Sequence, residues 1–190
     1  QKSERKARFL QDMNDGYRVL KENKPLFALL WIGTAYMFFF MPIAALFPLM
    51  SMSYFNGTPV HASIAEIAFA GGMLAGGILL SIWGGFKNRI LSIGLSILVM
   101  GVSIAVSGLL PSSAFPAFAV CCVAMGLTSP FYGVQNALIQ ERIAPEYLGR
   151  VFAMLSSVIS FAMPMGLLCS GIFAEQIGVE KWFLLCGIGI

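Results

Sequence analysis

Residues able to do chemistry are scarce in the apolar parts of this chain, and only one of them is charged. Glu66 is the single formal charge within five long apolar runs. A carboxylate in such surroundings is a candidate proton carrier or a binding group for a cationic ligand. The segment Ser63-Ile64-Ala65-Glu66 also fits a capping box at a helix start, in which Glu66 reaches back to a free backbone amide. Both roles stay open, and they are compatible.

A stripe of polar side chains at helical spacing is a second candidate site. Thr128, Tyr132 and Asn136 follow one another at intervals of four residues, with Gln135 beside them. These side chains share one face of a helix. They would lack partners in lipid, so this face should point toward protein or water. Pro130 breaks the helix there and frees a carbonyl group, and hydrogen bonding between helices without a ligand is an equally good explanation of the stripe.

Two other apolar runs carry groups that can line the same cavity. Ser156, Ser157 and Ser160 lie in the following run, toward the same end as the polar stripe, because consecutive helices are antiparallel. Tyr36 and Phe39 lie in an aromatic stretch of the first run. Aromatic walls with a few hydroxyl and amide groups suit a large apolar ligand. Packing or lipid contact is the alternative for most of these aromatic residues.

The chain shows no catalytic constellation. Its one histidine, His61, lies in a gap between runs without a cysteine or paired carboxylate nearby, which gives a metal site or nucleophilic mechanism no support. No Gly-rich phosphate loop followed by Lys-Ser/Thr is present, so ATP hydrolysis is not expected. We therefore expect no enzyme, no cofactor and no metal; any work would be driven by an ion gradient or by another chain.

The elements that must position these residues are membrane-spanning helices. Hydrophobic residues make up 58% of the chain and charged residues 11%, unlike a soluble domain. Each of five apolar runs is long enough to cross the hydrocarbon core as a helix. The runs are Leu26–Met50, Ala62–Gly84, Ile90–Leu110, Ala114–Ile139 and Val151–Phe173. A sixth run, Trp182–Ile190, is too short to span, so we expect a fragment with five complete helices and a truncated sixth.

Basic residues fall in alternate gaps. Seven of the twelve precede Pro25, two lie between the second and third runs, and two lie between the fourth and fifth. The remaining gaps hold only Lys181. By the positive-inside rule this distribution places the N-terminus and the gaps at 85–89 and 140–150 in the cytoplasm.

Residues 1–24 differ from the rest of the chain. Phe9, Met13, Tyr17 and Leu20 form one apolar stripe among charged residues. This pattern indicates an amphipathic helix at the cytoplasmic membrane surface, and a solvated linker is the alternative.

Small and sulfur-containing residues within the runs indicate packing. Gly72 and Gly76 form a GxxxG pair that lets two helices approach closely. The cysteines, which all lie in apolar runs, are expected to be reduced and packed, with no disulfide framework.

The gap Trp83–Arg89 and the segment Pro145–Phe152 carry a family resemblance. Short basic loops after even-numbered helices resemble those of major facilitator superfamily transporters. Pro-Glu-Tyr-Leu-Gly-Arg-Val-Phe at 145–152 resembles the signature of one branch, which contains macrolide-efflux proteins and siderophore exporters. Further segments, among them Tyr54–His61, Gly72–Gly77 and Pro130–Tyr132, resemble macrolide-efflux proteins, so the likeness covers nearly the whole chain.

The resemblance implies an all-α membrane protein that corresponds to the C-terminal six-helix half of a twelve-helix transporter. Residues 1–24 would be a cytoplasmic linker and 25–190 the transmembrane half-domain. Its spans would be about 26–50, 62–84, 90–110, 114–139, 147–173 and, truncated, 182–190.

The implied function is proton-coupled export of macrolides or other drugs by alternating access, without a cofactor, in the bacterial plasma membrane. The partners would be the lipid bilayer, the missing N-terminal half and an amphiphilic drug, and no nucleic acid. A non-transporting fragment, a half-size unit that dimerises, and an exporter of the same branch for another substrate such as a siderophore are the alternatives. A membrane enzyme is disfavoured because the chain lacks a catalytic set.

Within this resemblance we assign three groups of site residues. The substrate cavity wall would contain Tyr36, Phe39, Tyr132, Gln135, Asn136 and Ser160. Glu66 would act in proton coupling or add negative potential near the outer mouth. The cytoplasmic loops or gate would use Lys87, Arg89, Arg142 and Arg150. The gap at 84–89 lacks the acid of the family's loop motif, which leaves Lys87 and Arg89 to meet helix termini or acidic lipid heads.

Overall fold

The structure is a computed structural model that describes residues 17–18, 21, 24–85 and 88–190. The described part is almost entirely helical, and it contains no strand. Its elements are α2 (Lys24–Leu49), the π-helical turn η1 (Met50–Tyr54), α3 (Pro59–Trp83), α4 (Arg89–Leu109), α5 (Phe115–Tyr132), α6 (Val134–Arg142), α7 (Pro145–Ile177) and α8 (Val179–Gly189). Most of the predicted amphipathic segment 1–24 and Lys87 lie outside the described residues.

Five stretches are long and apolar enough to cross a membrane. They are Leu30–Tyr54, Pro59–Trp83, Arg89–Leu109, Phe115–Arg142 and Pro145–Ile177. The predicted fold class, an all-α membrane protein with five complete spanning helices, is confirmed. The last helix, α8, has 11 residues.

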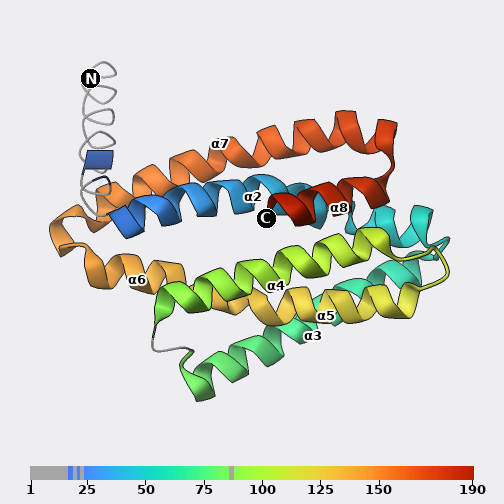
Figure 1. The fold of residues 1–190 in the computed structure, drawn as a ribbon, viewed down its shortest axis with the longest axis horizontal. Coiled ribbons are helices and arrows are strands. Elements are labelled where there is room, and N and C mark those ends of the chain that lie inside the picture. The colour runs from blue at the N-terminus through green and yellow to red at the C-terminus, as the bar shows by residue number, and fades with distance from the viewer. Residues whose placement is uncertain (1–16, 19–20, 22–23, 86–87) are drawn as a thin grey trace.

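The long helices run side by side along one axis, with the connections at two ends (Figure 1). One end, which we call the basic end, holds the start of α2, the α3–α4 connection and the short α6–α7 connection. The opposite end holds η1 and the α4–α5 and α7–α8 connections. α2 packs along α7, α3 packs on α5, and α4 lies between α5 and α8.

Close helix contacts depend on glycine. A side chain at Gly72 or Gly76 of α3 would overlap the backbone of Val123 or Leu127 in α5, and one at Gly126 of α5 would overlap Phe69 of α3. The close approach predicted for Gly72 and Gly76 is confirmed. All four cysteines are free, as predicted.

Aromatic rings hold the helices together toward the opposite end. Phe47 of α2 lies with its ring centroid 5.9 Å from that of Phe118 in α5 and 6.0 Å from that of Phe183 in α8. Beyond them the Tyr54 hydroxyl donates to the Leu110 carbonyl at 2.7 Å. The end of the first span is thus tied to the end of α4.

The start of α3 corrects the capping interpretation of Glu66. The helix begins at Pro59, whose fixed φ suits a first helical position. The Thr58 backbone N–H donates to Nδ1 of His61 at 3.1 Å, and the Ser63 hydroxyl donates to the Pro59 carbonyl at 3.1 Å. Glu66 therefore lies in the third turn of a helix that has already started, and the prediction that it caps this helix is wrong.

Candidate functional site

Three of the six predicted cavity residues meet between α2 and the α5–α6 junction. The Tyr36 and Tyr132 rings stack with centroids 4.5 Å apart and planes inclined by 22°. Phe40, one turn further along α2, also stacks on Tyr36, with ring centroids 5.3 Å apart and planes inclined by 10°. Tyr36 is 4% exposed and Gln135 is 7% exposed, whereas Tyr132 is half-buried.

Gly33 makes room for this group. A methyl group added at Gly33 would lie 2.8 Å from the Tyr132 hydroxyl and 3.1 Å from Nε2 of Gln135. The hydroxyl and the amide therefore lie directly over the α2 backbone, one turn before Tyr36. We call Gly33, Tyr36, Tyr132 and Gln135 the tyrosine cluster. It places a hydroxyl and an amide beside stacked aromatic rings inside the bundle.

A break in the fourth span lies between two members of the cluster. Pro130 was predicted to break the helix, but α5 continues through Pro130 to Tyr132. The interruption falls at Gly133, whose N–H donates to the Pro130 carbonyl at 3.1 Å, and α6 starts at Val134. A proline disturbs the hydrogen bonding of its own turn, and the chain relaxes at the next glycine. The break lies between Tyr132 and Gln135, and both of these side chains lie over Gly33.

The predicted polar stripe is divided by this break. Thr128 donates to the Met125 carbonyl at 3.0 Å and lines a hollow together with Ser92 and Ser96 of α4. Asn136 is exposed, outside the tyrosine cluster. The stripe therefore does not form one continuous wall.

Phe39 and Ser160 lie on other surfaces. Phe39 lines an open hollow of about 470 Å³ between α2 and α7. Its lining residues are Trp31, Thr34, Ala35, Phe38, Phe39, Val158, Phe161, Ala162 and Met165. Ser160 is exposed on α7, and its hydroxyl has no hydrogen-bond partner among the described residues. The hollow is nearly all apolar or aromatic, and Phe161, which is 76% exposed, marks it as an outward-facing surface.

Glu66 remains a charged side chain within a span. It is exposed, and it makes no hydrogen bond or ion pair within the described part of the chain. Together with Ala44, Phe47 and Phe69 it lines a small hollow of about 120 Å³ between α2 and α3. Among the described residues, no cluster of three or more His, Cys, Asp or Glu side chains could hold a metal ion.

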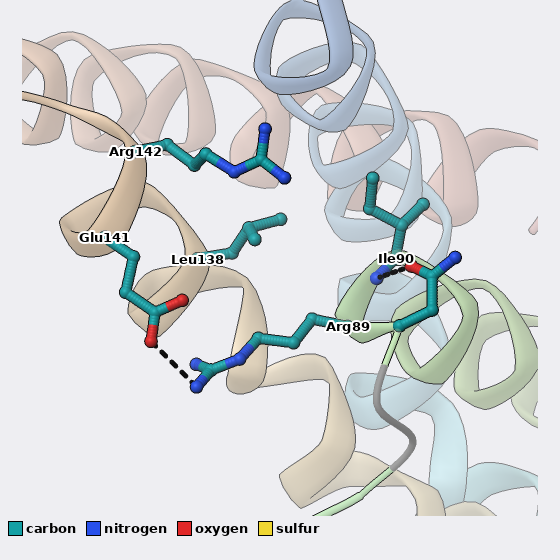
Figure 2. Close-up of a pocket in the computed structure, with 6 residues that line it drawn as sticks. Arg89, Ile90, Leu138, Glu141 and Arg142 are labelled. Carbon is teal, nitrogen blue, oxygen red and sulfur yellow. Dashed lines mark hydrogen bonds and ion pairs between the residues drawn. The ribbon is translucent and has the colours of Figure 1, made fainter.

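The predicted gate residues lie at helix ends more than in loops. Arg89 is the first residue of α4, Arg142 is the last of α6, and Arg150 lies in the second turn of α7. Only Ile143 and Ala144 separate α6 from α7, so most of the predicted loop at 140–150 is helical. An unpredicted ion pair joins Arg89 Nη2 to Glu141 Oε1 at 2.7 Å (Figure 2). The sequence could have indicated this pair, because antiparallel spans place residues 89 and 141 at the same end of the bundle.

Fold and site together define a multi-pass membrane protein of antiparallel helices with a partly polar aromatic cluster inside the bundle. Residues 20–190 match the model of the Major Facilitator Superfamily. The chain belongs to this superfamily of transporters.

Comparison with curated proteins gives a narrower likeness. The chain is 61% identical over 180 residues to Macrolide efflux protein A of Streptococcus pyogenes, which covers 94% of this chain and 44% of that protein. It is 61% identical over 160 residues to Macrolide efflux protein A of Enterococcus faecalis, covering 84% and 50% respectively. Multidrug efflux pump Tap of Mycobacterium tuberculosis is 30% identical over 133 residues, covering 70% of this chain and 31% of that protein.

The chain thus spans about half the length of the curated macrolide efflux proteins that it matches. No solved structure gives a significant match.

Proposed function

We propose that this chain is the C-terminal part of a secondary exporter that moves macrolides out of the cell in exchange for protons. The 61% identity to Macrolide efflux protein A over nearly the whole chain carries this proposal. The tyrosine cluster supports it, because a large amphiphilic drug needs aromatic surface with a few polar groups to orient it.

In this proposal the exporter works by alternating access. Two helical halves rock about a binding site near the middle of the membrane, and this chain supplies one wall of that site. The tyrosine cluster and Phe39 would contact drug from this half, and Asn136 and Ser160 would border the cavity that the other half closes. Glu66 would attract the cationic drug or take part in proton transfer.

The proposed setting is the bacterial plasma membrane. The basic end would face the cytoplasm, because basic residues concentrate there while the opposite gaps hold only Lys181. Arg89, Arg142 and Arg150 would then lie at the cytoplasmic surface, where an inner gate must form.

An efflux assay on the gene in its full length tests the drug site. Tyr132→Ala combined with Gln135→Leu removes a stacked ring and an amide from the cluster. Losing about 1.4 kcal/mol of drug contacts corresponds to about tenfold weaker binding, so macrolide resistance should fall by about that factor at unchanged protein level. Tyr147→Ala, which changes an exposed tyrosine at the start of α7, is the matched control. Unchanged resistance in the double variant would show that the cluster does not contact the drug.

A broader substrate range is the second candidate. The 30% identity to Multidrug efflux pump Tap favours it, as does the mostly apolar α2–α7 hollow, which offers few groups for selecting one drug. Resistance to several structurally unrelated amphiphilic drugs in the same assay would support it. Resistance to macrolides alone would exclude it.

A further inference from the structure

The hollow between the start of α4 and the end of α6 contains charged groups that do not belong to the tyrosine cluster or to the proposed drug-binding wall. It has a volume of about 450 Å³ and lies at the basic end of the bundle. Its lining residues are Asn88, Arg89, Ile90, Leu138, Glu141 and Arg142. Figure 2 shows Arg142 and Leu138 extending from α6 into this space, while Arg89 reaches across it from α4 to Glu141.

The charges of the hollow favour an anion. Two guanidinium groups face one carboxylate, so the lining carries one net positive charge. Arg142 forms no ion pair with any described residue. Guanidinium groups bind phosphate oxygens through two parallel hydrogen bonds, which makes a pair of arginines a suitable phosphate clamp.

The existing ion pair does not close the hollow. The Arg89 and Glu141 side chains are 42% and 53% exposed, and an exposed ion pair contributes little to stability. Arg89 can therefore exchange Glu141 for a phosphate oxygen at small cost. Glu141 then acts as a competitor that weakens anion binding without preventing it.

The apolar lining and the position of the hollow indicate what carries the phosphate. Ile90 and Leu138 lie beside the two arginines, and a free inorganic anion gains nothing from such side chains. Arg89 and Arg142 lie at the ends of two membrane spans, which is the level of lipid headgroups. Basic side chains at this level attract anionic lipids.

A second hollow adds a place for the lipid chain. Ser92, one turn beyond Arg89 on α4, lines a separate, mostly apolar hollow of about 220 Å³ with Trp83 and Leu95. An amphiphile whose head is held near Arg89 would have apolar surface available in the membrane direction.

We propose that Arg89 and Arg142 form a binding site for the phosphate group of an anionic lipid, and that Glu141 limits its affinity. This site goes beyond drug export and does not depend on it.

Lipid binding to the full-length protein in detergent tests the site. Native mass spectrometry would measure the apparent Kd for phosphatidylglycerol, for phosphatidylcholine and for inorganic phosphate. We expect phosphatidylglycerol to bind most tightly, Arg142→Gln to weaken it about tenfold, and Glu141→Gln to strengthen it about threefold. Lys181→Gln, which removes an exposed cation at the opposite end, should leave the Kd unchanged.

Each of three results would overturn one part of the proposal. Equal Kd values for phosphatidylglycerol in the parent protein and in Arg142→Gln would overturn the site. Phosphatidylcholine binding as tightly as phosphatidylglycerol would overturn its selectivity for anions. Inorganic phosphate with an equal affinity and an equal loss in Arg142→Gln would overturn the lipid as its source. The gain in Glu141→Gln is the decisive readout, because a purely structural ion pair would lose stability without gaining affinity.

Discussion

At the scale of single residues, the tyrosine cluster depends on a missing side chain. Gly33 lets the Tyr132 hydroxyl and the Gln135 amide reach the backbone of α2 while Tyr36 stacks on Tyr132. Polar groups are held beside aromatic rings because nothing at Gly33 pushes them away. A side chain there would separate α2 from the α5–α6 junction.

Gly33→Val should therefore impair transport without preventing membrane insertion. Overpacking costs about 1–3 kcal/mol, and about 1.4 kcal/mol corresponds to a tenfold change, so we expect about tenfold less macrolide efflux. Gly71→Val is the matched control, because a side chain at Gly71 meets no atom within 4 Å. Drug accumulation in cells and the amount of protein in the membrane are the two measurements. Full efflux by Gly33→Val would disprove the packing argument.

Glu66 is a second single residue with a testable role. A lone carboxylate in a membrane span is a candidate functional group. It lies beside Phe47 and Phe69 with no ion pair in the described structure. Glu66→Gln should lower proton-driven drug uptake into inverted vesicles about tenfold, since a lost charge-assisted contact costs about 1.5 kcal/mol. Glu175→Gln near the end of α7 should have no effect. If uptake by Glu66→Gln equals that of the parent protein, Glu66 has no role in coupling or attraction.

At the scale of helices, glycines let the backbones of α3 and α5 approach each other closely. Gly72 and Gly76 face the α5 backbone, whereas the neighbouring Gly71 and Gly77 face open space. Helix α3 thus has glycines that pack against α5 and glycines that pack against nothing. Substitutions at the two kinds of position can be compared directly.

Gly76→Ala should destabilise the protein, and Gly77→Ala should not. The new methyl group at Gly76 would overlap the Leu127 carbonyl, and a cost of about 1–3 kcal/mol lowers the unfolding midpoint by roughly 2–10 °C. Alanine at Gly77 changes the free energy of unfolding by at most about 1 kcal/mol, in the stabilising direction. Thermal unfolding of the purified full-length protein measures both, and equal midpoints for the two variants would contradict this packing.

Element boundaries also show where sequence analysis succeeds. The five apolar runs predict the five spans, because burial in lipid requires long uninterrupted apolar helices. Their ends were harder to predict. Local chemistry at Thr58 and Pro59 starts α3 earlier than hydropathy indicates, and charged helical turns extend α6 and α7 beyond their apolar cores.

The candidate site was predictable only in part for a related reason. Tyr36, Tyr132 and Gln135 have residue types that mark a site, and they do meet. Their contact with Gly33 depends on which helix packs against that glycine. The spacing of residues along the sequence does not contain this information. Asn136 and Ser160 have the same chemistry, yet both are exposed, because the spacing of polar residues does not show which helix face meets a neighbouring helix.

At the scale of the whole molecule, the distribution of charge predicts the orientation. In intact cells, a membrane-impermeant maleimide should label Ser113→Cys, between α4 and α5, and should leave Ala144→Cys, between α6 and α7, unlabelled until the cells are permeabilised. The parent protein is the control, and the cysteines of this chain lie in spanning helices or in α8. The reverse pattern would place the basic end outside and contradict the positive-inside assignment.

The most direct test of the central claim is the accumulation of a radiolabelled macrolide in cells that lack other macrolide exporters and carry the full-length gene. We predict clearly lower accumulation than in cells with an empty vector, and a protonophore should raise it to the empty-vector level. Equal accumulation in the two kinds of cell, with the protein present in the membrane, would contradict the proposed export of macrolides.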